Sequence, residues 1–211
     1  NKPERIVEAV AADLSPVKFG GLVGLGNDVA VYHLASPITD VEPMAVADVS
    51  LESTDVGQPF ASVGFGSQDN YEDISGNLSA TRKAGKTTLR ALEGKSFELM
   101  LGSYEAFLEQ MISVYGQEVV DEYADFIASW YNDTVILNGY EAWTGYVAGE
   151  SQTCHGDSGG PLVRRVNGES KIYGVVSGGW FSSQLSCDYG TFYATLGDKT
   201  REMITKAYSY S

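Results

Sequence analysis

The stretch that decides the fold is Cys154-His155-Gly156-Asp157-Ser158-Gly159-Gly160-Pro161-Leu162. A serine hydroxyl is a poor nucleophile unless a base removes its proton and donors stabilise the oxyanion that it creates. The glycines beside Ser158 let the backbone bend so that N–H groups point at one spot without interference from a Cβ atom. Apolar residues resume at Pro161, as at the start of a strand. A chance match is the alternative, but nine residues in this order are far more specific than a lone G-x-S-x-G.

The composition bounds the class of protein. The chain has 211 residues, a formal charge of −14 and a pI near 4.4. This length can bury a real core, as one large all-β domain or two small ones. The acidity argues against nucleic acid or an anionic membrane as a partner, and solubility is its plainest explanation. No apolar run is long enough to span a membrane.

Short strand signals, separated by turn residues, run through most of the chain. The expected strands lie at residues 5–10, 27–34, 60–66, 86–92, 162–166, 171–177 and 190–196. Gly57-Gln58-Pro59 is a candidate boundary, and Asn167-Gly168 is a strong hairpin signal. A C-terminal helix is expected over residues 198–207, with Asp198 as its candidate N-cap.

Residues 103–131 interrupt the β pattern. Apolar and aromatic residues recur there at spacings of three and four behind Ser103, a good N-cap, and Gly116 is a natural stop. The two sets are Tyr104, Phe107, Leu108, Met111, Ile112 and Tyr115, then Val119, Val120, Tyr123, Phe126, Ile127 and Trp130. The spacing predicts a helical hairpin with acidic outer faces. We interpret its aromatic residues as packing rather than as a binding surface.

The stretch around Ser158 resembles the nucleophile motif of the trypsin/chymotrypsin-like serine proteases. The resemblance implies an all-β fold of two antiparallel six-stranded barrels and peptide-bond cleavage through an acyl-enzyme on Ser158. Residues 1–57 would be the remainder of an incomplete first barrel, and residues 58–211 would form the second. Residues 97–135 would be a helical insert where the family has a short helix.

Asp28 is the candidate triad acid by the same resemblance. The run Asn27-Asp28-Val29-Ala30-Val31-Tyr32-His33-Leu34 resembles the family segment in which an aspartate opens an apolar run that ends in leucine. A turn aspartate that caps a strand is the alternative. Asp28 and Ser158 are 130 positions apart, against about 93 in chymotrypsin, and the excess is close to the size of the helical insert.

The resemblance also assigns roles around the nucleophile. Gly156 and Ser158 would supply the N–H donors of the oxyanion hole. In the family, the residue at Asp157 receives the new N-terminal amine when a zymogen is cut. Cys154 and Cys187 match a family disulfide, worth about 3–4 kcal/mol by chain entropy, and free thiols are the alternative.

The substrate pocket is expected to have a neutral floor. Gln152, followed by Thr153, falls where trypsin-like enzymes place the acid at the base of the pocket. Ser177, Gly178 and Gly179 match the strand that pairs with an extended substrate, although the family usually has tryptophan where Gly178 stands. Gly179 and Gly190 would line the pocket without side chains. Such a pocket does not demand lysine or arginine in the substrate.

The triad histidine is missing from the pattern. The family histidine lies about 45 positions before the acid, and 27 residues precede Asp28. The chain has two histidines, His33 and His155. In a strand, His33 would point to the face opposite Asp28, and His155 matches a family position over the pocket mouth. We interpret both as surface or rim histidines.

Two interpretations follow. In the first, the chain is the larger piece of an active secreted endopeptidase, and an N-terminal segment of the same precursor carries the histidine. In the second, it is a non-catalytic homologue that acts as a binding or regulatory module. We favour the first, because an intact Gly156-Asp157-Ser158-Gly159 with Asp28 has little structural reason to exist without a base. An unrelated β-rich binding domain would make both motifs and the cysteine pair coincidences.

The expected partners follow from the first interpretation. They are a protein or peptide substrate and the N-terminal fragment of the same precursor, with neither nucleic acid nor membrane. No cofactor or metal is expected, because nothing else in the sequence suggests a metal or redox site. The expected location is extracellular or periplasmic, after removal of any signal peptide.

Overall fold

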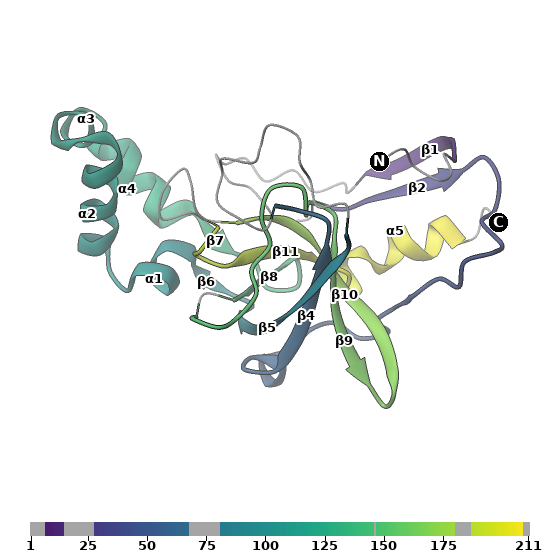
Figure 1. Cartoon of the computed structure of the whole chain (residues 1–211). Coiled ribbons are helices and arrows are strands. Elements are labelled where there is room, and N and C mark those ends of the chain that lie inside the picture. Colours follow the sequence, from purple (N-terminus) through teal and green to yellow (C-terminus); the bar gives the residue numbers. More distant parts are fainter. Residues whose placement is uncertain (1–6, 15–27, 68–80, 146, 180–186, 209–211) are drawn as a thin grey trace.

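Six strands close into an antiparallel barrel in the computed structural model, which describes residues 7–14, 28–67, 81–145, 147–179 and 187–208 (Figure 1). In sheet order they are β11 (Thr191–Thr195), β8 (Glu141–Thr144), β5 (Lys83–Ala91), β4 (Pro59–Gly64), β9 (Pro161–Val166) and β10 (Glu169–Gly179). The barrel closes because β10 also pairs with β11. All six strands lie within the residues predicted to form the second barrel.

The barrel interior is filled by alternate residues of its strands. In β5, Thr87, Leu89 and Ala91 are buried while the residues between them are partly exposed, as expected when successive side chains point to opposite faces. Leu89 packs in one core cluster with Leu162 and Tyr193, all three of which are fully buried. Burying a large apolar side chain contributes about 1.5–3 kcal/mol, so this interior fixes the frame that carries the site.

The turn between β9 and β10 has the predicted chemistry. Asn167 and Gly168 have φ values of 52° and 90°, in the left-handed region that a two-residue hairpin turn requires. Asparagine and glycine adopt this region most readily. The hairpin places the end of β10 beside the nucleophile loop.

The first 57 residues contribute little regular structure. Strands β1 (Ala9–Leu14) and β2 (Ala30–Leu34) form an antiparallel two-stranded sheet, and β3 (Ala45–Val46) adds to β10 in parallel. A short 3₁₀ turn, η1 (Ser53–Asp55), precedes the barrel. The strand expected at 5–10 is found later in the sequence, and residues 1–6 of that expectation lie outside the described residues. Most of the polar stretch after Gly66 also lies outside them.

Four helices project from one end of the barrel (Figure 1). They are α1 (Ser96–Leu101), α2 (Tyr104–Tyr115), α3 (Gln117–Glu122) and α4 (Ala124–Asp133), and the short strands β6 (Gly94–Lys95) and β7 (Val135–Ile136) pair at their base. Ser103 caps α2 by accepting a hydrogen bond from the Ala106 N–H, and Gly116 ends the helix with φ 88°. The second arm of the predicted hairpin is broken at Tyr123, whose φ and ψ of −108° and 26° are not helical.

The helical insertion has an aromatic core of its own. Phe107, fully buried, lies between Phe97 and Tyr131 at ring-centroid distances of 4.5 and 5.2 Å. This core belongs to one cluster with Trp143 and Phe192 of the barrel strands. Packing therefore explains these aromatic residues, as predicted, and it roots the insertion in the barrel wall.

The C-terminal helix α5 (Asp198–Tyr208) lies beside the barrel on the side away from the insertion (Figure 1). Met203 and Ile204 pack with Val29, Ala194 and Leu196, which ties the start of β2 to the barrel. Its bounds match the predicted helix within a residue. No described helix has the length and apolar character needed to cross a bilayer.

Candidate active site

Ser158 lies exposed in the loop between β8 and β9. Hydrogen bonds fix the backbone around it: the Gly159 N–H donates to the Val176 carbonyl, and the Val176 N–H donates to the Gly160 carbonyl, each at 2.9 Å. Within the described residues, the N–H groups of Gly156 and Ser158 have no hydrogen-bond acceptor. The loop thus holds two backbone donors that the fold itself does not use.

The backbone at Gly156 explains part of this arrangement. Its φ of 92° lies in the left-handed region that favours glycine. The turn that follows is closed by the Asp157 N–H, which donates to the Cys154 carbonyl at 3.0 Å, and by the Gly160 N–H, which donates to the Asp157 carbonyl at 2.8 Å. A side chain at position 156 would strain the turn that carries Ser158.

The structure brings Asp28 close to this loop, although 130 positions separate it from Ser158. The Ser177 hydroxyl donates to a carboxylate oxygen of Asp28 at 2.9 Å. Ser177 directly follows Val176, whose backbone is bonded to the nucleophile loop. The strand β10 therefore connects the candidate acid to the candidate nucleophile.

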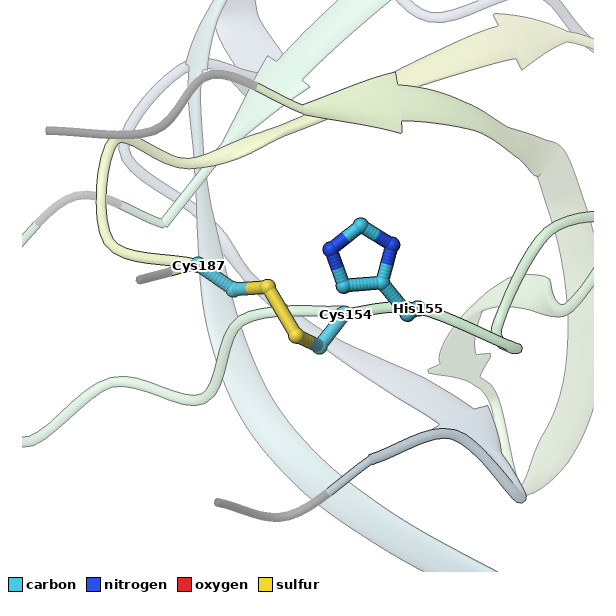
Figure 2. Close-up of side chains that lie close together, drawn as sticks. All are labelled: Cys154, His155 and Cys187. Atoms are coloured by element: carbon cyan, nitrogen blue, oxygen red, sulfur yellow. A yellow bond between two sulfur atoms is a disulfide. The ribbon is translucent and has the colours of Figure 1, made fainter. Parts of the chain in front are cut away.

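The two histidines lie where the sequence placed them. His33 lies in β2, where residues 31 and 33 are half-buried and residues 30, 32 and 34 are exposed, so it faces away from the side that Asp28 shares with the exposed set. His155 stands beside the disulfide in Figure 2, and its imidazole and the two sulfur atoms lie within 4.8 Å of one another. No described histidine is hydrogen-bonded to Asp28 or Ser158 by any contact in the structure.

Cys154 and Cys187 form the predicted disulfide across 33 positions (Figure 2). It joins the start of the nucleophile loop to the segment that leads into β11. Because the two sulfur atoms are bonded to each other, they offer no thiolate to a metal or a redox reaction. Their neighbourhood with His155 is therefore not a metal centre.

Asp157 anchors the loop from below. Its carboxylate accepts from the Gly66 N–H at 2.7 Å and from the Cys154 N–H at 3.0 Å. A Cβ atom on Gly64 would lie 1.8 Å from that carboxylate, so glycine is needed for this close approach. A cavity of about 340 Å³ opens beside Asp157, lined also by Ser151 and Gln152.

A second cavity, of about 550 Å³, lies on the other side of the nucleophile. Ser158, Gly156 and Pro161 line it together with the larger side chains of Met44 and Phe65. Phe65 exposes 50% of its surface. A partly apolar cavity that includes an exposed serine can receive a substrate group next to that serine.

The predicted pocket floor is neutral and already paired. The Gln152 side chain donates to the Asp188 carbonyl at 3.1 Å and accepts from the Gly190 N–H at 2.5 Å. Thr153 is held by Thr191, whose hydroxyl accepts from the Thr153 N–H at 3.1 Å. A carboxylate in place of Gln152 could not donate to a carbonyl, so these contacts suit an amide.

The walls of that pocket are made by glycine. A Cβ atom on Gly190, whose φ is 86°, would lie 2.3 Å from the Trp143 indole nitrogen, and one on Gly179 would lie 2.9 Å from the Gly190 carbonyl. Gly178 and Gly179 pair with Phe192 and Thr191 of β11. Among the described residues, the other edge of β10 at positions 177–179 is unpaired, which leaves backbone groups for an extended peptide.

Sequence reasoning missed two features of the site. The Ser177 side chain was unassigned, because only its backbone was considered. An ion pair between Arg90 and Glu150, 2.8 Å apart, holds the loop before Gln152, and Arg90 also donates to the Gly145 carbonyl. Burial opposes ionisation of Glu150, but hydrogen bonds from Thr88 and Arg90 outweigh it and lower the pKa of that carboxyl. No motif or spacing in the sequence signals either contact.

This arrangement defines a trypsin-like protease fold, and the comparisons agree. A family model described as Trypsin matches residues 76–196, more than half of the chain. The chain therefore belongs to the trypsin family.

The structure is also similar to that of neuropsin, "a serine protease expressed in the limbic system of mouse brain". The TM-score is 0.57 and the identity 15%, over 95% of this chain and 71% of that chain. At this identity the likeness shows the fold alone, and it confirms the fold class predicted from the sequence. A comparison with curated protein sequences finds no match.

Proposed function

We propose that this protein is a serine endopeptidase that cleaves peptide bonds through an acyl-enzyme on Ser158. The contact between Ser177 and Asp28 is the observation that carries the proposal. It holds an acid from the first 57 residues against the strand that is bonded to the nucleophile loop. A turn aspartate whose only task was to cap β2 would not need that partner.

The proposed roles follow from what each group can do. A histidine between Asp28 and Ser158 takes the serine proton, and Asp28 orients that histidine and stabilises its charged form. The Gly156 and Ser158 N–H groups then hold the oxyanion. After the amine product leaves, water attacks the acyl-enzyme with the same histidine as base.

The base comes from a segment of the same precursor that precedes Asn1 in the gene product. Support lies on the surface of residues 1–57, which we propose to be the remainder of a first barrel. Val10, Tyr32 and Val41 expose 66%, 64% and 60% of their surface. The sheet β1–β2 has two strands and therefore two open edges. A packed segment would cover both the apolar side chains and an edge.

The remaining parts of the proposal concern maturation and location. The disulfide suits an oxidising compartment, so we place the enzyme outside the cell or in a periplasm. The cavity beside Asp157 has room for an ammonium group near its carboxylate. We propose that a newly formed N-terminal amine binds there in a mature enzyme made from a zymogen.

The pocket supports cleavage after neutral, fairly large side chains. Burying a lysine or arginine against Gln152 would leave a cation without a charged partner, which is costly. Peptide-library profiling should therefore show no selectivity for basic residues, and Gln152→Asp should shift the preference toward them. A strong Arg or Lys preference in the wild-type protein would contradict this assignment.

The test of the proposed function starts from native material. Intact mass and N-terminal sequencing identify any companion segment, and hydrolysis of a peptide thioester measures the activity. We expect activity in the preparation that contains the segment and its loss in the Ser158→Ala variant, by about 10⁶-fold in kcat. A single polypeptide that starts at Asn1 and hydrolyses no ester would contradict the proposal.

A non-catalytic homologue is the second candidate. The observation in its favour is that neither His33 nor His155 contacts the candidate acid or nucleophile in the described structure. In that case the open edge of β10 and the two cavities would bind a peptide without cleaving it. The mass and ester measurements above separate the two candidates.

A further inference from the structure

The far end of the helical insertion carries an exposed apolar surface. It comprises five side chains that each expose between 41% and 52% of their area, although the core of the insertion is well packed. They are Val114, Tyr115, Val119, Tyr123 and Phe126. We call this set the tip surface. It spans the end of α2, all of α3 and the start of α4, at the point farthest from the barrel in Figure 1.

Helical spacing separates the tip surface from the core of the insertion. Val119, Tyr123 and Phe126 follow one another at steps of four and three, which places them on one side of the arm. Val120 and Ile127, at a step of seven, are buried on the other side. The tip surface is thus not the outer edge of the core, but a second apolar face with nothing packed on it within the described residues.

The charge around this face has one sign. Between Ser96 and Asp133 the chain has eight acidic residues and no Lys, Arg or His. Four of the acids, Glu118, Asp121, Glu122 and Asp125, are exposed among the residues of the tip surface. In the contacts of the described structure, none of these four pairs with a cation. An apolar face within an uncompensated negative field favours a partner that is both apolar and cationic.

We propose that the tip surface is a docking site for a basic amphipathic segment, rich in Lys or Arg with apolar side chains on one face, in the enzyme's protein substrate. Naming the partner a substrate rests on the proposed endopeptidase function. The recognition itself rests on the complementary charge and on the five exposed apolar side chains.

The position of the tip surface sets how such a substrate would bind. The base of the insertion shares a core with Trp143, whose indole donates to the Tyr189 carbonyl at 3.1 Å beside Gly190 of the pocket wall. The helix α2 has 12 residues and is about 18 Å long, so the tip lies at about that distance from its base. An extended chain covers about 3.3 Å per residue, so the basic segment would lie at least about six residues from the scissile bond.

A binding experiment tests this without relying on catalysis. The full chain carrying Ser158→Ala is titrated against a fluorescent 18-residue peptide of Lys and Leu, patterned as an amphipathic helix. The substitution prevents cleavage and makes the result independent of whether the protein is an enzyme. We expect saturable binding that weakens with added salt, and no binding of the same peptide with Glu in place of Lys.

Two variants locate the binding site. Replacing Tyr115, Tyr123 and Phe126 by Ser should weaken binding at least about tenfold, the loss of about 1.4 kcal/mol. Replacing the four tip acids by their amides should also weaken it and flatten its salt dependence. The matched control replaces four exposed acids outside the insertion by amides, at Glu42, Glu169, Asp188 and Glu202, and should leave binding within about twofold.

The outcomes separate the alternatives. Equal losses in the tip-acid and control variants would show attraction to the net charge alone and overturn the proposal. Binding of the Glu peptide, or unchanged binding by the aromatic variant with circular dichroism like that of the wild type, would overturn it too. Docking without any ester hydrolysis by the native protein would leave the tip surface standing and contradict the proposed function only.

Discussion

The two halves of the candidate catalytic site are held in very different ways. Ser158 belongs to a closed barrel, with a disulfide on one side and the buried anchor of Asp157 beneath it. Asp28 precedes a two-stranded sheet, and it reaches the barrel through its contact with Ser177 and the packing of its neighbour Val29. The first half is complete within the described residues, whereas the second exposes apolar side chains and open strand edges.

This difference shows which part of the site each region determines. The barrel sets the position of the nucleophile, of the backbone donors and, through Ser177, of the acid. The first 57 residues supply the carboxylate but no histidine next to it. Loss of a barrel contact should therefore change stability and activity together, whereas a change at Asp28 should change activity alone.

The largest expected effect breaks the link between the two halves. In native protein, Asp28→Asn should lower kcat by about 10⁴-fold, because the amide no longer orients the base in the correct tautomer. Thermal unfolding should shift little, since Asp28 is exposed. Ester hydrolysis and calorimetry measure the two quantities. Asp121→Asn, an exposed aspartate far along the insertion, is the matched control, and an equal loss of activity in it would contradict the assignment.

The next effect tests whether the helical insertion is part of the barrel half. Phe107→Ala should destabilise the protein by about 3–5 kcal/mol, since Phe107 is fully buried in the core shared with Trp143. Phe126→Ala, in the exposed tip surface, should stay within about 0.5 kcal/mol. Urea unfolding gives both values. Similar values for the two variants would mean that the insertion has no core distinct from its surface.

The disulfide tests how strongly the nucleophile loop is fixed. Replacing Cys154 and Cys187 together by Ser should lower stability by about 3–4 kcal/mol, because the unfolded chain regains the freedom of a 33-residue loop. Denaturant unfolding measures the change, and wild-type protein in reductant should show the same loss. Retention of full stability in both samples would contradict the proposed contribution of the disulfide.

The smallest effect concerns a buried acid in the barrel wall. Burial raises the pKa of Glu141 above its ordinary value of 4.5, although the Leu137 N–H, which donates to it at 2.9 Å, acts the other way. The folded state then binds this proton more tightly than the unfolded state does. Its contribution is present below pH 4.5 and is lost as the pH rises through the raised pKa.

Glu141→Gln tests that pH dependence. Between pH 4 and pH 7 the variant should lose less stability than the wild type, because an amide does not titrate and can still accept the Leu137 hydrogen bond. Unfolding in urea at both pH values measures the difference. A larger loss in the variant would reverse the sign of the argument.

Much of this site could be predicted because its residues are adjacent in sequence. The nucleophile loop is nine consecutive residues, and the Asn167-Gly168 turn depends on its own two residues. The strand β8 was missed because all four of its residues are buried, which removes the alternation that marks a half-buried strand. The break at Tyr123 and the Ser177 hydroxyl depend on contacts between distant segments, which no local pattern records.

The central claim is that Asp28 and Ser158 act with a histidine other than His33 or His155. The most direct measurement is the rate at which a fluorophosphonate labels Ser158 in native protein as a function of pH. We predict one labelled site, and a rate that rises through an ionisation near a histidine pKa of about 6.5, unchanged by His33→Ala and His155→Ala and abolished by Asp28→Asn. No labelling of Ser158, or a rate lost in either histidine variant, would contradict the account.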